Sequence, residues 1–380
     1  MVEYNFYNPT RLVFGEGKIA ELGKILEKRG YHKVLLIFGG GSIKKNGVYE
    51  QVVTALKDSN IALVECGGVR SNPILAKVRE GIALAKAEQV DAVLAVGGGS
   101  VIDTAKSVAA GVYANDVWNI FERTEKITQV LPIFTVLTLS ATASEMNCSA
   151  VLTNETEQKK YGTGHPLLYP QVSIIDPSIQ VSLPWEQTVN GALDAMAHIM
   201  EYYFIGTEEE TVLGVDEALL KSIIKAMGKL KLKPDDVLAR ANLAWAVTMA
   251  LNGMSGTGLK GGDWACHDIS HAISAKYPQI AHGAALGVLF PAWMEYVEAA
   301  NEHQFNRFSR GIFDCIDIEE GVIKYRNLLK SWQAATKLRE LGVQSADLAT
   351  LSAMITERGP IGRLQKLSRS DVEEILRMAY

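Results

Sequence analysis

The sequence predicts an N-terminal α/β domain with a parallel sheet, followed by an all-helical C-terminal domain. The chain has 380 residues, more than one hydrophobic core usually serves, so we expect two domains. Up to about residue 180, short β-branched runs alternate with helical patterns, as in parallel strands joined by crossover helices. After Asp176 and Pro177 the strand signals stop. The predicted domains are therefore residues 1–180 and 181–380.

Short apolar runs predict the strands of the first domain. They are residues 33–38, 61–65, 91–96, 133–137 and 171–175. Helical periodicity predicts helices at residues 73–89 and 101–112 in the first domain, and at 186–204, 209–230, 234–252, 321–340 and 371–379 in the second. Residues 4–14 could form an added edge strand or a strand exchanged with another subunit, and the sequence leaves both open.

The composition argues against several classes of function. The chain is 48% hydrophobic and 21% charged with a net charge of −5, and it has no basic stripe, so nucleic acid is not expected as a partner. The apolar runs are broken by charge or glycine, so no membrane span is expected. The first residues lack the pattern of a signal peptide. Four cysteines without Cys-x-x-Cys spacing fit a reduced protein of the cytoplasm.

Four residues have the types and spacing of a catalytic metal site. Asp194 and His198 lie four positions apart in a helical pattern, so a carboxylate oxygen and an imidazole nitrogen project from one face. His267 follows 69 residues later, and then His282, in a chain with seven histidines. Imidazoles with one carboxylate suit Fe²⁺ or Zn²⁺ better than Mg²⁺ or Ca²⁺. The competing interpretation is hydrogen-bonded core histidines and an ion-paired or capping aspartate.

Two predicted strands run directly into glycines, which indicates a dinucleotide site. The turns contain Gly39, Gly40, Gly41 and Ser42 in one case, and Gly98, Gly99 and Ser100 in the other. Glycine lets the backbone approach a ligand, Ser100 can cap the following helix, and a helix N-terminus favours a pyrophosphate. Both turns fall at the carboxyl ends of parallel strands, where open α/β sheets bind ligands. Tight turns also use glycine for conformational reasons alone.

Together, these motifs resemble the iron-containing (group III) alcohol dehydrogenases, and most of all their butanol dehydrogenase and broad aldehyde reductase branch. The similarity covers nearly the full length. It is carried by residues 8–15, 38–47, Asn72-Pro73, Gly97 to Ser100 with Asp103 and Lys106, Thr138 to Glu145, Asp176-Pro177, and Gly191-x-x-Asp-x-x-x-His198.

The resemblance implies a Rossmann-like N-terminal domain and an all-α C-terminal domain, an architecture shared with dehydroquinate synthase, with nicotinamide and metal in a cleft between them. The metal ligands would be Asp194, His198, His267 and His282, binding Fe²⁺ in the first place and Zn²⁺ as the alternative. His271 matches a histidine near the nicotinamide, and either a proton relay or a packing role is open to it. The expected cofactor contacts are Gly39, Gly40, Gly41, Ser42, Asn72, Gly98, Gly99, Ser100, Asp103, Thr138, Thr142, Ser144 and Lys160.

Three departures from the family pattern stand out. The usual Gly-Thr-Gly-Ser-Glu reads here as Ala141-Thr-Ala-Ser-Glu145, so two flexible positions have gained methyl groups. The interval from His267 to His282 is one residue longer than expected. Members that prefer NAD often carry an aspartate where this chain has Gly40, and its absence removes repulsion against a 2′-phosphate. We therefore expect NADP, with NAD as the alternative.

The predicted reaction is reversible hydride transfer between NAD(P)(H) and a small primary alcohol or aldehyde such as butanol or butanal. We expect a homodimer. A metal- and nucleotide-dependent lyase like dehydroquinate synthase is the second hypothesis, although that class should carry more basic residues near the ligands. A non-catalytic nucleotide sensor is the third, although a sensor needs no metal set.

Overall fold

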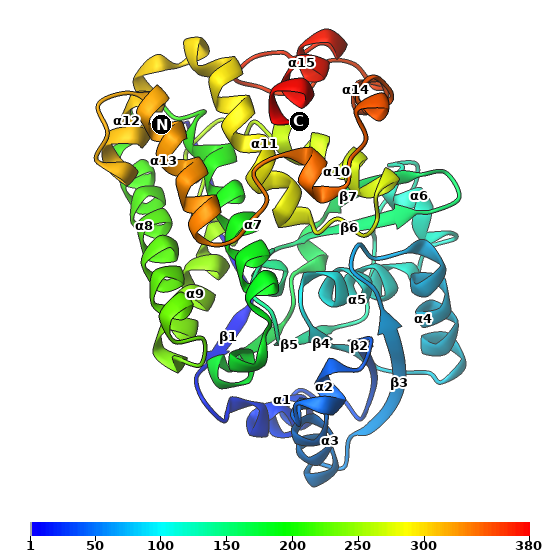
Figure 1. The fold of residues 1–380 in the computed structure, drawn as a ribbon. Coiled ribbons are helices and arrows are strands. Elements are labelled where there is room, and N and C mark those ends of the chain that lie inside the picture. Colours follow the sequence, from blue (N-terminus) through cyan, green and yellow to red (C-terminus); the bar gives the residue numbers. More distant parts are fainter. Residues whose placement is uncertain (1) are drawn as a thin grey trace. The chain divides into compact units, whose positions relative to one another are not determined.

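The computed structural model describes residues 2–380 (Figure 1). The chain divides into two units. One, here the sheet unit, consists of Asn8–Leu183 and Lys233–Thr248. The other, here the helical unit, consists of the residues up to Tyr7, Pro184–Leu232 and Met249–Tyr380. The segment 233–248 thus belongs with the sheet although it lies far beyond residue 180 in sequence.

Six parallel strands form the main sheet, in the order β1-β8-β5-β4-β2-β3. They are β1 (Arg11–Phe14), β2 (Lys33–Gly39), β3 (Ala62–Val69), β4 (Ala92–Gly97), β5 (Ile133–Leu137) and β8 (Val172–Ile175). The predicted α/β class with a parallel sheet is confirmed. The edge strand expected within residues 4–14 is present in part, because Arg11–Phe14 pair with β8 inside the same chain.

Helices cover both faces of this sheet, which explains why its strands are almost uniformly apolar. Alternate residues of a strand point to opposite faces. Val34 and Leu36 of β2 therefore join a core with α1 (Leu22–Lys28) and α3 (Val48–Asp58). Leu35 and Ile37 join a second core with α4 (Leu75–Ala87) and α5 (Gly99–Gly111).

A two-stranded antiparallel hairpin follows β5 and was not predicted. Its strands are β6 (Ser149–Asn154) and β7 (Lys159–Gly164). Two short helices also belong to this unit. They are α2 (Ser42–Lys45), which follows the first glycine turn, and α6 (Val117–Phe121), which contacts α5 and β7. The hairpin packs along α5, so it adds side chains to the surroundings of the second glycine turn.

The helical unit is built around α11 (His282–Val297), which contacts α7, α10, α13 and α15. The other helices are α7 (Trp185–Tyr203), α8 (Glu210–Leu232), α10 (Ala265–Lys276), α12 (Glu302–Phe313), α13 (Ile318–Ser331), α14 (Leu348–Ile355) and α15 (Arg369–Ala379). Helix α9 (Val237–Ala250) falls mostly in the sheet unit. The predicted all-helical second half is confirmed, because its described residues contain no named strand.

One predicted helix is wrong in its extent. Periodicity predicted a single helix over residues 321–340, but α13 ends at Ser331. The chain then passes through Gln333, whose φ is 61°, and a separate 3₁₀ turn spans Leu338–Leu341. A left-handed residue cannot continue a right-handed helix, so the apolar spacing beyond Ser331 belongs to a different element.

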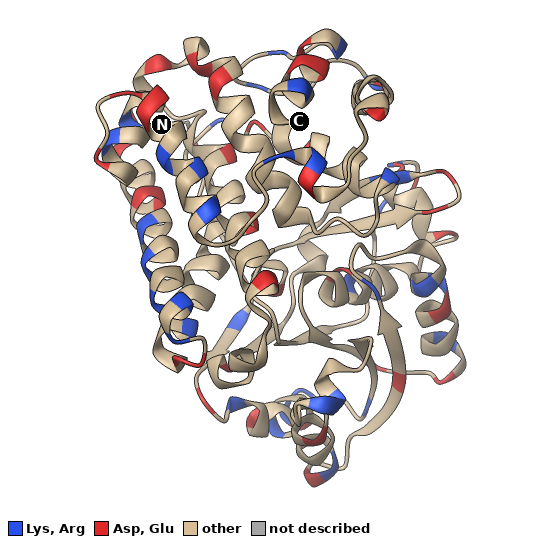
Figure 2. Ribbon diagram, in the orientation of Figure 1, with Lys and Arg blue, Asp and Glu red and all other residues tan. Residues whose placement is uncertain are grey.

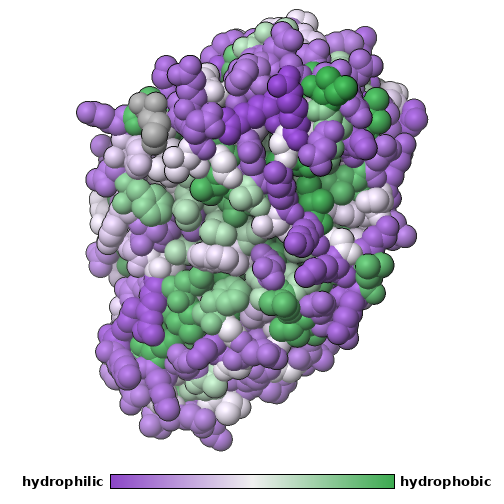
Figure 3. Space-filling model, turned by 90° about the vertical axis from the view of Figure 1, so that its left-hand side faces the viewer, coloured by the Kyte–Doolittle hydropathy of each residue, from purple (hydrophilic) through white to green (hydrophobic). Residues whose placement is uncertain are grey.

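Charged and apolar groups on the surface follow the secondary structure. Figure 2 shows acidic residues in the first part of α8 and lysines toward its end, as the helix dipole favours. Figure 3 shows green apolar patches within a mainly hydrophilic face. The exposed large hydrophobic side chains include Leu232, Leu238 and Trp245. Within the described residues, none of the helices combines the length and the hydropathy that a membrane span requires.

Candidate functional site

Three of the four predicted ligands meet in the helical unit. One ligand atom from each of Asp194, His267 and His282 lies within 4.8 Å of the others. Asp194 comes from α7, His267 from α10 and His282 from the first position of α11. Three separate helices therefore converge on one point. The structure thus brings together residues that are far apart in sequence, as the metal hypothesis requires.

His198 lies beside this cluster without completing it. Its Nε2 is 3.8 Å from Oδ1 of Asp194, and its ring centroid is 4.8 Å from that of His267. Burial lowers the pKa of His198 well below its usual value, so the ring is neutral. A neutral imidazole is the form that binds a metal. Its role as the fourth ligand stays a prediction.

A glycine lets α11 approach α7 closely enough to form the cluster. A Cβ atom on Gly283 would lie 1.9 Å from the carbonyl oxygen of Asn190, which is impossible without moving one helix. Gly287, one turn later, faces Leu193 in the same way, with 2.8 Å to its Cδ1. His282 directly precedes Gly283, so this close contact fixes His282 near Asp194, where the Nε2 to Oδ1 distance is 3.9 Å.

Two buried residues that the sequence analysis missed contact two of the predicted ligand histidines. The Nδ1 atom of His267 lies 2.8 Å from Oε1 of Glu201, which is fully buried on α7. The Nδ1 atom of His282 lies 2.8 Å from Oγ of Ser270 on α10. The periodicity of α7 contains a signal for Glu201, because Asp194, His198 and Glu201 at i, i+4 and i+7 share one helical face.

Aromatic rings enclose the cluster. Trp264 packs edge-on against His267, with ring centroids 5.1 Å apart, and against Tyr202 at 5.3 Å. His271 stacks on His282 with ring centroids 5.3 Å apart and an interplanar angle of 22°. The structure therefore places His271 next to a predicted ligand and one helical turn from His267.

The residues present fit a divalent transition metal. Nε2 of His267 is buried and has no hydrogen-bond partner within residues 2–380. A buried polar atom without a partner costs roughly 1–3 kcal/mol, which coordination would offset. Two imidazoles and one carboxylate, with the imidazole of His198 beside them, are donors of the kind that iron and zinc sites use. A hydrogen-bonded core histidine would not leave Nε2 of His267 without a partner.

The two glycine turns occur in the sheet unit as predicted, but their glycines have additional structural roles. Gly41 has a φ of 105°, which favours glycine. A Cβ on Gly97 would lie 2.4 Å from Val101, and one on Gly99 would lie 2.4 Å from Thr142. The predicted cap at Ser100 is wrong, because the N-cap of α5 is Gly98 and Ser100 lies inside the helix. Helix α5 starts at Gly99, two residues earlier than predicted, so Ser100 is not at the capping position.

A buried polar network lies beneath the second turn. Nζ of Lys106 donates to Ser144 Oγ at 2.8 Å, and Ser144 Oγ donates to Asp103 Oδ1 at 2.6 Å. Lys106 also donates to the carbonyls of Asn147 and Ser149, and Asp103 accepts from the backbone N–H of Val151. Burial lowers the pKa of Lys106 to about 8 although Asp103 opposes this. The network ties α5 to the loop after β5 and to β6.

The remaining predicted cofactor contacts lie on the same part of the sheet unit. The backbone N–H of Thr138 donates to the carbonyl of Gly97, so β5 leads directly to the second turn. Oγ1 of Thr142 accepts from the N–H of Ser144. Asn72 and Lys160, predicted separately, are hydrogen-bonded to each other. Within this loop Ala143 has a φ of 50°, at one of the positions where the family pattern has glycine.

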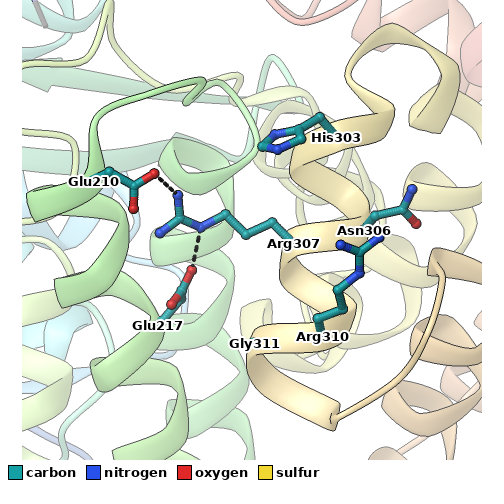
Figure 4. A pocket seen from close by; sticks show the side chains of 7 residues that line it. All are labelled: Glu210, Glu217, His303, Asn306, Arg307, Arg310 and Gly311. Carbon is teal, nitrogen blue, oxygen red and sulfur yellow. Dashed lines mark hydrogen bonds and ion pairs between the residues drawn. The ribbon is translucent and has the colours of Figure 1, made fainter.

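A cavity of about 520 Å³ lies between α8 and α12 of the helical unit (Figure 4). Arg307 points into it and donates to Glu210 and Glu217, at 2.7 Å each. The positive charge of Arg307 is therefore neutralised within the cavity. None of the four predicted ligands lines it. The cavity is separate from the metal cluster, and its residues were not singled out by the sequence.

Comparisons with known proteins cover almost the whole chain. Residues 9–177 match the family model "Iron-containing alcohol dehydrogenase", and residues 188–380 match "Fe-containing alcohol dehydrogenase family, C-terminal". NADH-dependent butanol dehydrogenase A of Clostridium acetobutylicum is 40% identical, with 100% of each chain covered. NADPH-dependent aldehyde reductase YqhD of Escherichia coli is 30% identical, with 94% of each covered.

A solved structure agrees with the fold and with the resemblance. The crystal structure of NADH-dependent butanol dehydrogenase A from Thermotoga maritima is 47% identical, covers 100% of this chain and 99% of its own, and gives a TM-score of 0.97. Both halves of the chain match the two parts of a single family in the right order. The expected resemblance is confirmed, and the protein belongs to the iron-containing alcohol dehydrogenases.

Proposed function

We propose that the protein is a metal-dependent oxidoreductase that transfers hydride between NAD(P)(H) and a small primary alcohol or aldehyde, such as butanol and butanal. The observation that carries this proposal is the convergence of Asp194, His267 and His282 on one point, with His198 beside them. Family membership supports the same reaction class, because the relatives described above are named as butanol dehydrogenases and an aldehyde reductase.

The four ligands hold a divalent metal, Fe²⁺ in the first place and Zn²⁺ as the alternative. When bound, the metal supplies Lewis-acid polarisation of the substrate oxygen, and the nicotinamide supplies or accepts the hydride. Trp264 and the buried surroundings shield His267 from water. His271, stacked on His282, is the candidate to hold or move the proton of the alcohol oxygen.

The second glycine turn holds the cofactor through backbone groups. Helix α5 is 13 residues long and begins at Gly99, so its first N–H groups can bind a pyrophosphate. We assign direct contacts to Gly98, Gly99, Ser100 and the half-buried Thr138 and Thr142. Asp103 and Ser144 are buried and hydrogen-bonded to each other, so we propose that they support the turn and do not contact the cofactor directly.

NADP is the proposed preference. Gly40 offers no carboxylate to repel a 2′-phosphate. A Cβ atom added at Gly40 would meet no atom within 4 Å, so the turn is open at this position. Lys44 does not by itself favour NADP, because its Nζ already binds Glu65 at 2.9 Å. Two of the relatives described above carry NADH in their names and one carries NADPH, so this preference depends on Gly40.

We also propose a homodimer of the cytoplasm. The four cysteines form no disulfide, which fits a reducing compartment. Strand β1 lies at the edge of the sheet, where a second copy could pair with it. Size-exclusion chromatography with light scattering measures the mass of the protein in solution. A monomer at micromolar concentration contradicts the proposed homodimer.

Initial rates test the function directly. The metal-free protein is loaded separately with Fe²⁺ or Zn²⁺, and reduction of a series of linear aldehydes is followed with NADPH and with NADH. We expect metal-dependent turnover that is faster with NADPH and strongest with Fe²⁺. Absence of turnover with every metal and both cofactors contradicts the oxidoreductase assignment. Equal rates with and without metal contradict the role of the cluster.

A further inference from the structure

A single buried carboxylate, that of Glu201, links two of the helices that supply the metal ligands. It lies on α7, seven residues after Asp194, and is fully buried. Oε1 accepts from Nδ1 of His267 at 2.8 Å and from the backbone N–H of the same residue at 3.2 Å. Oε2 accepts from the backbone N–H of Trp264 at 2.5 Å. One side chain thus receives three hydrogen bonds from the start of α10.

These contacts determine which nitrogen of His267 carries the proton. Both oxygens of Glu201 already accept backbone N–H groups, so the carboxylate acts as an acceptor and Nδ1 of His267 as a donor. The lone pair of the ring is then on Nε2, the buried atom without a hydrogen-bond partner among the described residues. That is the form in which an imidazole binds a metal.

The three histidines differ in what their second nitrogen meets. His267 faces a carboxylate, His282 faces the hydroxyl of Ser270 at 2.8 Å, and Nδ1 of His198 is buried without a hydrogen-bond partner in residues 2–380. A charged acceptor makes the imidazole a stronger electron donor than a neutral one does. His267 is therefore the ligand whose orientation and basicity the protein controls most.

Glu201 also stabilises an unfavourable backbone conformation at this point. Trp264 has a φ of 67°, which is unusual for a bulky residue. Its N–H is held by Oε2 of Glu201, and the carbonyl of Glu201 accepts from the N–H of Asp263 at 2.9 Å. This turn sets the direction in which α10 starts and places the Trp264 ring against His267. Loss of the carboxylate would release both the turn and the ring.

We propose that Glu201 is a positioning residue of the metal centre, which fixes His267 as the Nδ1–H tautomer and anchors the start of α10 so that Nε2 faces Asp194 and His282. This inference rests on the proposed metal site. One carboxylate, that of Asp194, thus serves as a ligand, and another, that of Glu201, supports the ligand His267.

Cobalt substitution tests the proposal without relying on turnover. Metal-free wild type, Glu201→Gln and a control, Asp216→Asn, are titrated with Co²⁺ against a chelator, and the visible absorption of the bound ion is recorded. Asp216→Asn is the control because it also replaces a buried carboxyl group by an amide, and that carboxyl group bonds to Ser255 and not to a predicted ligand. We expect Glu201→Gln to bind Co²⁺ about 10–100 times more weakly with a shifted spectrum, and Asp216→Asn to match wild type.

The outcomes separate this inference from the proposed function. A folded Glu201→Gln protein with wild-type affinity and spectrum overturns the positioning role. Wild type that takes up no Co²⁺, or a His267→Ala variant that binds it normally, contradicts the metal site itself. If Glu201→Gln does not fold, ¹⁵N shifts of histidine-labelled wild type without metal decide the matter. His267 must then show a protonated Nδ1 and a bare Nε2, and the opposite tautomer overturns the proposal.

Discussion

Lys160 and Asn72 meet in the sheet unit, where Nζ of Lys160 donates to Oδ1 of Asn72 at 2.8 Å across 88 residues of sequence. Both side chains are buried, and Asn72 has a φ of 57° directly before Pro73. Lysine on β7 of the hairpin is thereby tied to the turn that follows β3. The hairpin was not predicted as structure, yet it carries a residue that was predicted as a cofactor contact.

Replacing this lysine should weaken cofactor binding. We expect Lys160→Met to raise the dissociation constant of NADPH about tenfold, which corresponds to about 1.4 kcal/mol, because the predicted contact of this buried lysine with the cofactor is lost. Metal content should stay unchanged. Fluorescence titration with NADPH measures the effect. Lys159→Met is the control, since Lys159 is a neighbouring lysine that pairs with Glu157 at 3.0 Å. Equal affinities for the two variants would show that Lys160 has no part in binding.

Removing any one of the four predicted ligands should abolish metal retention and activity. The variants are Asp194→Ala, His198→Ala, His267→Ala and His282→Ala. A site that loses one ligand loses charge, geometry or both. Elemental analysis and aldehyde reduction are measured on the same preparations. His303→Ala, in the separate cavity between α8 and α12, serves as the control. The result for His198 is the most informative, because a variant with normal metal content would remove this residue from the set.

A carboxylate at Gly40 should change the preference for the cofactor. The Cβ atom of an aspartate at position 40 would meet nothing within 4 Å. The aspartate can accept from a ribose 2′-hydroxyl but repels a 2′-phosphate, so the ratio of kcat/KM for NADH over NADPH should rise about 10- to 100-fold, equivalent to roughly 1–3 kcal/mol. Steady-state kinetics with both cofactors gives this ratio. A wild-type enzyme that already clearly prefers NADH refutes the argument from Gly40.

His271 has two roles open to it, and one variant distinguishes them. If it relays the proton of the alcohol, His271→Ala should lower the rate by roughly 10²–10⁴ while the metal stays bound. If it supports His282 by stacking, the variant should lose metal affinity or stability, with turnover per bound metal little changed. Metal content and rate are determined on one sample. Full activity in a metal-replete variant rules out both roles.

Stability should fall as the pH rises because of Asp216 on α8. Burial, opposed by its hydrogen bond from Ser255 and reinforced by the charge of Glu217, raises the pKa of Asp216 from 3.8 to about 8. Between these two values the folded protein holds a proton that the unfolded chain has lost. Stability from this group is therefore fully present below pH 4 and declines toward pH 8, by at most about 1.4 kcal/mol per pH unit.

The neutral variant Asp216→Asn isolates this effect. Its melting temperature, relative to wild type, should be higher at pH 8 than at pH 5, because the amide has no proton to lose. Thermal unfolding followed by circular dichroism at the two pH values gives the comparison. A difference that is the same at both values would mean that Asp216 is ionised in the folded protein throughout this range.

The residue pattern predicted those helices and strands that are determined by the sequence within the element itself. The buried strands of the sheet were found because both faces are covered, which makes them continuous apolar runs such as residues 33–38. The hairpin of β6 and β7 was missed, because Lys159, Lys160 and the glycines at 162 and 164 dilute the strand signal. The true end of α13 depends on the left-handed Gln333, which has no periodic signature.

The sequence predicted the residues of the candidate site from their types and spacing, but not how the helices bring them together. Asp194 and His198 could be paired through their spacing on one helix, but the meeting with His267 and His282 depends on how three helices pack. The close approach at Gly283 that allows it involves the backbone of Asn190, a contact no pattern predicts. Glu201 shares the periodicity of the ligands, yet only the structure shows that it faces His267.

Gly99 and Thr142 are packed so closely that the second glycine turn and the loop after β5 form a single preset surface. The shape of this surface exists before any ligand arrives. A binding loop that does not have to become ordered loses little conformational entropy on association, so more of the contact energy appears as affinity. An anion at the start of α5 would therefore meet backbone groups that this packing already holds in place.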